Sequence, residues 1–592
     1  MKTGIIAPAA AELARLALRP RTRRTAGTGI RSSFCSLLVR TALVAGMLGG
    51  CHSGSSGDNP RAAPQLVRAM ISDPKTFNPV LITDAGSSDI LANVFEGLVR
   101  LNTKSLAVEP LLAERWETSA DGTVWTFHLR PGVRWHDGTP LTAGDVVFTF
   151  DAIYDPRVPN SSKHVLTVDG QPIRAEAVDE KTVRLTLPRP FAPLLTALPE
   201  IIPRHRLGEA LKEGRFTQEW GINSAPETIV GTGPYRIRQY VPSQFVRLER
   251  NPDYWMRDEQ GQPLPYLDQR TVLLIPDMDS AYLKFLAGQT TIHAPRPEEI
   301  AELRAQADQL SIQVEEIGLS TASQFVVFNR NPRHYGKDGK VDPKLSWFTD
   351  SHFLRAIAHA MDKPSMVLNC LSGYGQPAIT DISPSDTFFY NPELKDYAYD
   401  LDAARAELAA GGYRLDGSVL RDRDGNAVEL SLTTNSGNKI RERIATILQE
   451  DWAKLGIKAN YRPVDFTTLV EKLDTTFDWD AILIGFTSSP DPHNSANLLR
   501  SNGNLHMWNP NQPKPETEWE AEIDRLVEAG SRELDRDKRR AVYWRIQAIL
   551  HEQLPMIQTV RAVDHVAYRR NLQNLDQTVW GINHPERLRF AP

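Results

Sequence analysis

The sequence predicts a large α/β fold in which strands and helices alternate along the chain. Segments with period-two alternation, such as Val124–Leu129, are interleaved with segments of helical spacing, such as Ser88–Val99. No repeat recurs at a fixed period. The chain has 592 residues, of which 41% are hydrophobic and 24% charged, so it is long enough for three or more compact units with their own cores.

The first half of the chain opens with a predicted strand at Gln65–Met70, followed by the helix at Ser88–Val99. The strand Val124–Leu129 closes on a turn at Arg130-Pro131-Gly132. Thr142 is expected to be the N-cap of the next helix, because Asp145 follows three residues later in the spacing of a capping box. Short strands are predicted at 183–187 and 246–248.

The second half continues the alternation with longer helices. Helical spacing is found at 353–361, 401–410, 440–455, 467–473 and 520–554. Strands are predicted between these helices, at 324–328, 430–434, 458–463 and 481–486.

The first fifty residues are typical of a signal peptide. An Arg-rich stretch precedes an apolar run at Thr41–Gly50, which is too short to span a bilayer. Leu48-Gly49-Gly50-Cys51 resembles a lipobox, so we expect lipidation of Cys51, a signal at 1–50 and a flexible tether at 51–64. The alternative is an ordinary signal peptide in which the cysteine occurs by chance.

Charge and cysteine content narrow the possible functions. Residues 1–50 hold eight basic side chains and one acidic one, and the rest holds 60 basic and 72 acidic, a net charge of −12. A net negative charge after residue 50 repels the phosphates of nucleic acid, so no nucleic-acid partner is expected. With Cys35 and Cys51 assigned to the signal and the anchor, Cys370 alone cannot form a disulfide framework or a Cys-rich metal site.

Known catalytic patterns are missing from the sequence. It contains no GxSxG elbow, HExxH helix, GxxxxGK loop or strand-to-helix GxGxxG, so no catalytic residue, metal or cofactor is predicted. Aromatic residues in predicted loops are typical of a ligand cleft, although core packing explains most such residues. They are Trp135, Trp255, Trp347, Phe388, Phe389, Trp508 and Trp580.

The sequence resembles the extracellular solute-binding proteins of peptide ABC transporters, the oligopeptide/dipeptide class or family 5 of periplasmic binding proteins. The most specific match is Leu112–Glu117 followed by Asp121–Val146. Shorter matches lie at 95–99, 231–235, 251–255, 265–268, 354–363 and 455–457. The resemblance covers essentially the whole chain after the tether.

This resemblance implies a two-lobed, periplasmic-binding-protein-like fold of type II, cluster C, with an extra subdomain inserted in lobe one. The expected lobe one comprises residues 65–101, 232–277 and 557–592. The inserted subdomain is expected at 102–231 and lobe two at 278–556.

The resemblance also implies a function in transport and not in catalysis. The protein is expected to capture an extended peptide between its lobes and deliver it to the transmembrane subunits of an ABC permease and their ATPases. We expect a monomer at the periplasmic or extracytoplasmic face of a bacterial cell membrane, held there by the lipid alone. The alternative outside the class of transport receptors is a hydrolase or a chaperone that uses the same cleft.

The resemblance places ligand contacts at Thr83, Asp84 and Ala85 in lobe one. In lobe two it places them at Phe486, Thr487, Ser488 and Ser489, with Asp491 and Trp508 as further candidates. Peptide-binding members carry an Asp for the ligand's α-ammonium where this chain has Ser489, and an unpaired buried ammonium costs about 3–5 kcal/mol.

This departure leaves two possibilities. Either Asp491 replaces the missing acid, or the ligand has no free amino terminus. In the second case the solute is an opine or sugar conjugate, a metal chelate or a cell-wall peptide.

Overall fold

The computed structural model describes residues 65–591 except 72, 338–339 and 504. The expected signal, the tether and the lipidation site at Cys51 lie outside these residues. Within the described part of the chain, no helix is long and apolar enough to cross a membrane.

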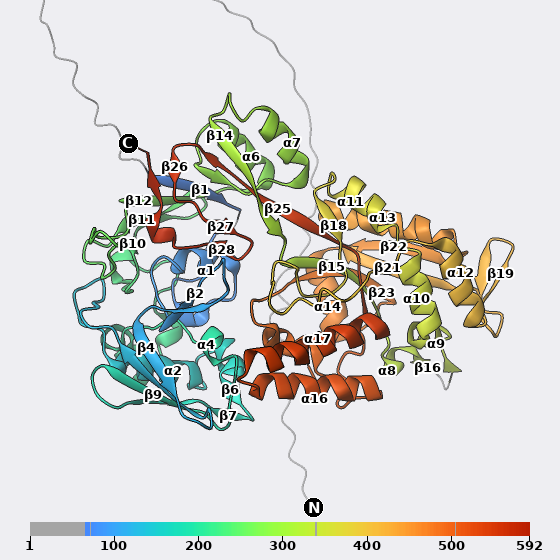
Figure 1. Cartoon of the computed structure of the whole chain (residues 1–592), viewed down its shortest axis with the longest axis horizontal. Helices are drawn as coiled ribbons and strands as arrows, with labels where there is room; N and C mark the ends of the chain where they lie inside the picture. Colours follow the sequence, from blue (N-terminus) through green and yellow to red (C-terminus); the bar gives the residue numbers. More distant parts are fainter. Residues whose placement is uncertain (1–64, 72, 338–339, 504, 592) are drawn as a thin grey trace, which may run out of the picture. The chain divides into compact units, whose positions relative to one another are not determined.

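The first sheet brings the start of the chain beside a much later segment. Its order is β1 (Leu66–Met70), β12 (Gln269–Leu274), β11 (Phe245–Arg250) and β10 (Tyr235–Val241). Strand β1 runs parallel to β12, and the remaining pairs are antiparallel. The helix α1 (Ala85–Leu91) follows β1 and leads to β2 (Val99–Leu101) (Figure 1).

The predicted helix at 88–99 is wrong in its bounds, for a tertiary reason. Asp84 caps α1 by accepting a hydrogen bond from the Ser87 amide, and the helix ends at Leu91. Beyond it, the carbonyls of Asn93 and Val94 accept hydrogen bonds from the amides of Tyr235 and Gly233 instead of continuing the helix. A Cβ atom on Gly231 would lie 1.8 Å from the Val94 carbonyl oxygen, so this close approach requires glycine.

The segment between β2 and β10 carries a four-stranded antiparallel sheet. Its order is β4 (Ala113–Thr118), β5 (Val124–Leu129), β9 (Thr182–Thr186) and β8 (Arg174–Ala177). Helix α2 (Ala143–Tyr154) packs against it and has the predicted capping box of Thr142 and Asp145. One hydrophobic core extends from Phe77 through this sheet to Leu274, so the segment 102–231 shares its core with the first sheet.

The second large sheet is mixed and has five strands. Its order is β22 (Lys458–Val464), β21 (Glu429–Asn435), β23 (Ala481–Thr487), β15 (Ala322–Phe328) and β24 (Met556–Gln558). Along β15, Val326 and Phe328 belong to one hydrophobic core, and Phe325 and Val327 belong to another. The sheet is therefore buried on both faces, as is usual for the sheet of an α/β protein.

Helices cover both faces of this sheet (Figure 1). They include α10 (Ser351–His359), α12 (Leu401–Ala410), α13 (Lys439–Ala453), α14 (Phe466–Glu471), α16 (Glu518–Arg532) and α17 (Arg536–Gln553). The helical pattern predicted at 520–554 is in fact two helices. The break comes at Asp535, whose carboxylate accepts hydrogen bonds from the amides of Asp537 and Lys538 and so starts α17.

The long strand β25 (Val560–Arg569) connects the two regions (Figure 1). Its first residues pair with β18 (Gly375–Pro377), and the residues from Val563 onward pair with β14 (Ile312–Leu319). Residues 278–319 were expected in lobe two, yet β14 and β13 (Ile292–His293) both pair with β25. Because β13 also lies beside β1 of the first sheet, we propose a lobe boundary near Ser320 in place of the expected boundary at residue 278.

Candidate functional site

The candidate segment in lobe one lies at the N-terminus of α1. Thr83 and Ala85 are exposed, whereas Asp84 is half-buried. The Asp84 carboxylate accepts hydrogen bonds from the Ser87 amide at 2.8 Å and from the Ser87 hydroxyl at 2.7 Å. Asp84 therefore holds the helix end in place, and its neighbours Thr83 and Ala85 present free surface.

The candidate segment in lobe two lies at the carboxyl end of β23. Phe486 is half-buried and packs against Phe325, with ring centroids 5.7 Å apart, and Thr487 is exposed. The amide and hydroxyl of Ser488 both donate to the Thr321 carbonyl at 2.9 Å. Ser489 accepts a hydrogen bond from the Asn494 side chain at 2.6 Å.

Asp491 is buried and already paired. Its two carboxylate oxygens lie 2.7 and 2.9 Å from the two terminal nitrogens of Arg539. Burial opposes the charge on Arg539, but the Asp491 carboxylate outweighs it, so the pKa of Arg539 is raised. A ligand ammonium would have to compete with this guanidinium for Asp491. The sequence offers no pattern that singles out Arg539.

Trp508 lies in the core of lobe two. Its side chain has no exposed surface, packs against Trp519 and donates a hydrogen bond to Glu520 at 3.2 Å. Trp508 therefore presents no surface to a ligand in this conformation, and core packing accounts for it.

The inserted subdomain touches lobe two through a set of contacts that we call the closure contact, defined by residues 189–196 against 491–493 and 528–532. Arg189 lies 3.0 Å from Glu528, and the Ala192 amide donates to the Ser531 carbonyl at 2.8 Å. Phe191 meets the His493 ring edge-on at 5.6 Å. These contacts join the two regions independently of β25.

A large cavity lies in lobe one, and we call it the lobe-one chamber. Its volume is about 640 Å³. It is lined by parts of β1, α1, β12, β13, the crossing strands β14 and β25, and the hairpin of β27 (Gln577–Thr578) and β28 (Gly581–Ile582). Asp89, on the exposed side of α1, and the exposed C-cap residue Ala92 belong to its wall. Thr83–Ala85, at the other end of the same helix, do not line it.

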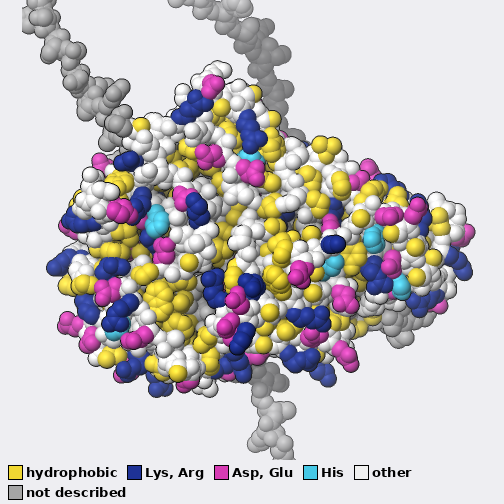
Figure 2. Space-filling model, in the orientation of Figure 1, with side chains coloured by type: hydrophobic (Ala, Val, Ile, Leu, Met, Phe, Trp, Pro, Cys, Tyr) yellow, Lys and Arg dark blue, Asp and Glu magenta, His cyan; other side chains and the backbone are white. Residues whose placement is uncertain are grey.

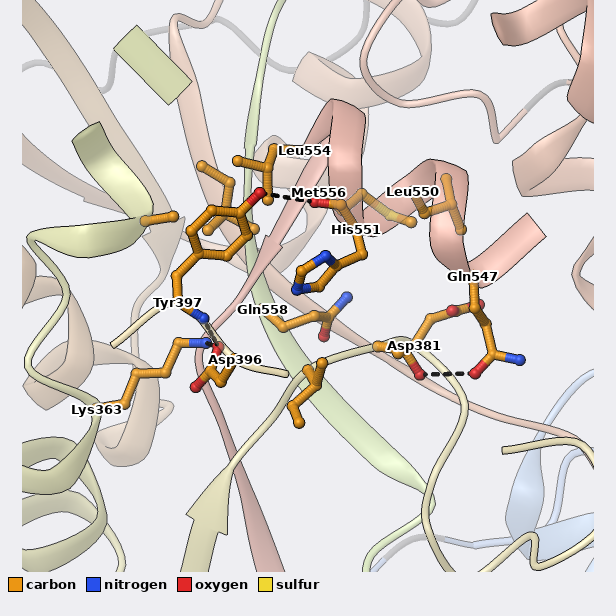
Figure 3. A pocket seen from close by; sticks show the side chains of 14 residues that line it. Lys363, Asp381, Asp396, Tyr397, Gln547, Leu550, His551, Leu554, Met556 and Gln558 are labelled. Carbon is orange, nitrogen blue, oxygen red and sulfur yellow. Dashed lines mark hydrogen bonds and ion pairs between the residues drawn. The ribbon is translucent and has the colours of Figure 1, made fainter. Parts of the chain in front are cut away.

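A second cavity is too small to hold a solute. It has a volume of about 20 Å³ and lies in lobe two around Lys363 and Asp396, whose charged groups are 2.5 Å apart (Figure 3). Burial lowers the pKa of Lys363 against the opposing effect of Asp396. The cavity has room for one water, which would bridge Nε2 of His551 and Oε1 of Gln558, two buried atoms without a hydrogen-bond partner.

Neither a metal site among the described residues nor a basic patch on the face drawn in Figure 2 stands out. Among residues 65–591, with the gaps given above, no three His, Cys, Asp or Glu side chains are placed to hold a metal ion. On the face shown in Figure 2, basic and acidic side chains are interspersed.

Two sheets with their helices, joined by crossing strands, define a two-lobed binding protein of the periplasmic type. The chain matches the bacterial extracellular solute-binding proteins, family 5, over residues 107–506, and it belongs to this family. Family members are extracellular solute-binding proteins. A relative from Deinococcus radiodurans, 28% identical over 85% of this chain and 88% of its own, is named a probable ABC transporter-binding protein.

Individual relatives agree with this assignment. The di/tripeptide-binding protein 2 of Pseudomonas aeruginosa is 28% identical over 84% of this chain and 90% of its own. The oligopeptide-binding protein AppA of Bacillus subtilis, solved with a nonapeptide, has a TM-score of 0.68 at 24% identity and covers 90% of this chain and 99% of its own. NikA of Brucella suis, solved with Fe(III)-EDTA, has a TM-score of 0.72 at 23% identity and covers 89% and 100%.

Proposed function

We propose that this protein is the receptor of an ABC importer that captures a peptide or a related small solute and delivers it to the membrane permease. The observation that carries the proposal is the family match over residues 107–506. The crossing strands β14 and β25 add a physical basis, because two connections between lobes can act as a hinge.

Ligand binding works through lobe closure. A ligand that touches both lobes stabilises the closed state by its higher affinity for that state. Thr83–Ala85 in lobe one and the main chain of Thr487 and Ser489 in lobe two supply groups for an extended ligand, since the Ser488 amide is bonded to Thr321. Such pairing is independent of side-chain identity. The closure contact of Arg189 and Ala192 with Glu528 and Ser531 adds protein–protein energy to the closed state.

Peptide is the first ligand candidate, supported by the peptide-binding name of the relative from Pseudomonas. A solute without a free amine is the second, and the charges at β23 favour it. Ser489 stands where the family has an acid, and Asp491 is held by Arg539. The fold accommodates both classes, since it holds a nonapeptide in one neighbour and Fe(III)-EDTA in another.

The receptor has no catalytic step in this proposal and acts as a monomer. Lipidation at Cys51 anchors it at the extracytoplasmic face of the cell membrane, where it meets the permease and its ATPases. Cys51→Ser should release the full-length protein into the soluble fraction, and retention of the variant in the membrane fraction would count against the anchor.

Retention of solutes from a defined mixture tests the receptor function. The chain from residue 52 is immobilised, exposed to equal amounts of free and N-acetylated di- to pentapeptides, and washed, and the retained masses are identified. Saturable retention of unchanged compounds is expected. Conversion of the mixture would establish a hydrolase, whereas retention of unfolded proteins without any saturable small solute would establish a chaperone.

A further inference from the structure

We propose that the lobe-one chamber is a ligand subsite for a bulky apolar or aromatic group that carries a hydrogen-bond acceptor and no amine. This inference rests on the proposed receptor function and names the chemistry that the receptor selects. None of the ligand segments expected from the sequence lines the chamber.

The size and walls of the chamber suit such a group. A volume of about 640 Å³ lies within the range of small-molecule sites, about 300–1,000 Å³. Apolar side chains from five separate elements face it, among them Met70, Ile292, Ile317, Val566 and Trp580. An apolar group that enters the chamber leaves water where it meets these walls, and such burial is the main source of affinity in sites of this kind.

The charges of the chamber disfavour an amine. Asp89 is the one carboxylate among the lining residues, and it lies 2.6 Å from Arg68. Arg270 is a second cation in the wall, buried and bonded to the Asn93 side chain at 2.8 Å. An ammonium group in the chamber would therefore meet two guanidinium groups and no unpaired carboxylate.

The unpaired hydrogen-bonding groups of the chamber wall are donors, so they favour a ligand that carries an acceptor. Two side-chain atoms of the lining residues are buried without a hydrogen-bond partner, Nε1 of Trp580 and Nε of Arg270. Both are N–H donors. Both atoms are covered in this conformation, so the proposal requires the Trp580 or Arg270 side chain to turn its N–H toward the chamber. A ligand oxygen favours that movement, because a buried donor without a partner is costly.

The chamber also adjoins the hinge. Ile317 and His565, from the two crossing strands, are part of its wall. Val579, at the tip of the β27–β28 hairpin, is beside Gly318, where an added Cβ would lie 3.6 Å from the Val579 side chain. A group bound in the chamber therefore contacts the place where β14 passes from lobe one to lobe two. Its binding can shift the equilibrium between the open and closed arrangements of the lobes.

Calorimetric titration with two matched probes tests the subsite. N-acetyl-Phe-Phe offers aromatic groups and a carboxylate without an amine, and Phe-Phe-amide offers the same aromatic groups with an ammonium and no carboxylate. Wild-type protein should bind the acetylated acid at least tenfold more tightly than the amide.

Variants of the chamber wall test the same subsite. Ala92→Trp fills the chamber from an exposed position and should weaken binding of the acetylated acid at least tenfold. The control Ala406→Trp, at an exposed position of α12, should not weaken it. Trp580→Phe, which keeps the ring and removes the donor, should weaken binding about fivefold.

The outcomes separate the subsite from the receptor function. If wild-type protein retains a solute from the peptide mixture but Ala92→Trp binds as wild type does, the receptor stands and the chamber proposal is overturned. A preference for Phe-Phe-amide would also overturn it, as would the absence of saturable binding of the acetylated acid. If no solute of any kind is retained, the receptor function itself fails.

Discussion

The carboxyl end of β23 and the lobe-one chamber are both candidates to meet the ligand, and they are built in opposite ways. At β23, Ser488, Ser489 and Asp491 are all bonded to other protein groups. In the chamber, Trp580 and Arg270 keep buried donors without partners. On our proposal, lobe two supplies a rigid edge and a closing surface, and lobe one supplies the selective chemistry.

The largest expected effect comes from breaking the ion pair at the β23 end. Arg539→Ala leaves the Asp491 carboxylate buried without its guanidinium, which costs about 3–5 kcal/mol. Differential scanning calorimetry should show a clearly lower unfolding temperature for lobe two. Arg540→Ala is the matched control, because Arg540 pairs with the exposed Asp537. Equal effects of the two variants would contradict a rigid, internally bonded edge.

A pH effect is expected at His493, which borders both Asp491 and Phe191. Burial lowers the pKa of His493 to about 4 from an ordinary value of 6.5. The unfolded chain therefore takes up a proton before the folded one does, so the stability from the neutral ring is complete above pH 6.5 and is lost as the pH falls toward 4.

His493→Gln removes this titration and provides the comparison. The difference in unfolding free energy between wild type and variant should shrink by about 3 kcal/mol over that range, at about 1.4 kcal/mol per pKa unit. Urea titrations at several pH values measure it. A difference that stays constant from pH 7 to 4 would exclude a neutral, buried His493.

Restoring an acid at the β23 end should change ligand preference. Ser489→Asp places a carboxylate where the family pattern has one, so binding of peptides with a free amino terminus should tighten at least tenfold, about 1.4 kcal/mol. Ser489→Asn is the control of similar size without charge. Calorimetric titration with free and acetylated forms of one tripeptide measures the change. Equal effects of Ser489→Asp and Ser489→Asn would show that the tighter binding does not come from pairing with the ammonium group.

The smallest effect is expected at the closure contact. Arg189 is largely buried and lies near both Asp169 and Glu528, so Arg189→Ala should destabilise the closed state by about 1 kcal/mol. Ligand affinity should then fall about fivefold. Arg184→Ala serves as the control, since Arg184 pairs with exposed Glu176 within the subdomain. Unchanged ligand affinity in Arg189→Ala would mean that the closure contact does not stabilise the closed state.

Local patterns predicted much of the fold. The strand Val124–Leu129 and the capping box of Thr142 and Asp145 are confirmed, because both are set by residues close in sequence. The end of α1 could not be predicted, since it depends on hydrogen bonds to Gly233 and Tyr235 far along the chain. The break at Asp535 is not visible in the apolar spacing, because this spacing continues across it.

The candidate site was harder to predict for the same physical reason. The chamber combines β1, α1 and the hairpin at 577–582, which lie at opposite ends of the chain. Trp580 did carry a signal, as an aromatic residue in a predicted loop. No sequence pattern singles out Arg539. The role expected for Asp491 therefore did not include its ion pair with Arg539, which only the fold brings near.

Native mass spectrometry of the chain from residue 52, as isolated from cells, tests the central claim most directly. We expect one protomer that carries a bound small solute, identified as an apolar or aromatic compound with a carboxylate or carbonyl oxygen and a blocked or absent amine. We also expect loss of this mass in Ala92→Trp and its retention in Ala406→Trp. A bound ladder of peptides with free amino termini, kept equally by both variants, would agree with a peptide receptor but contradict the amine-free ligand and the chamber subsite.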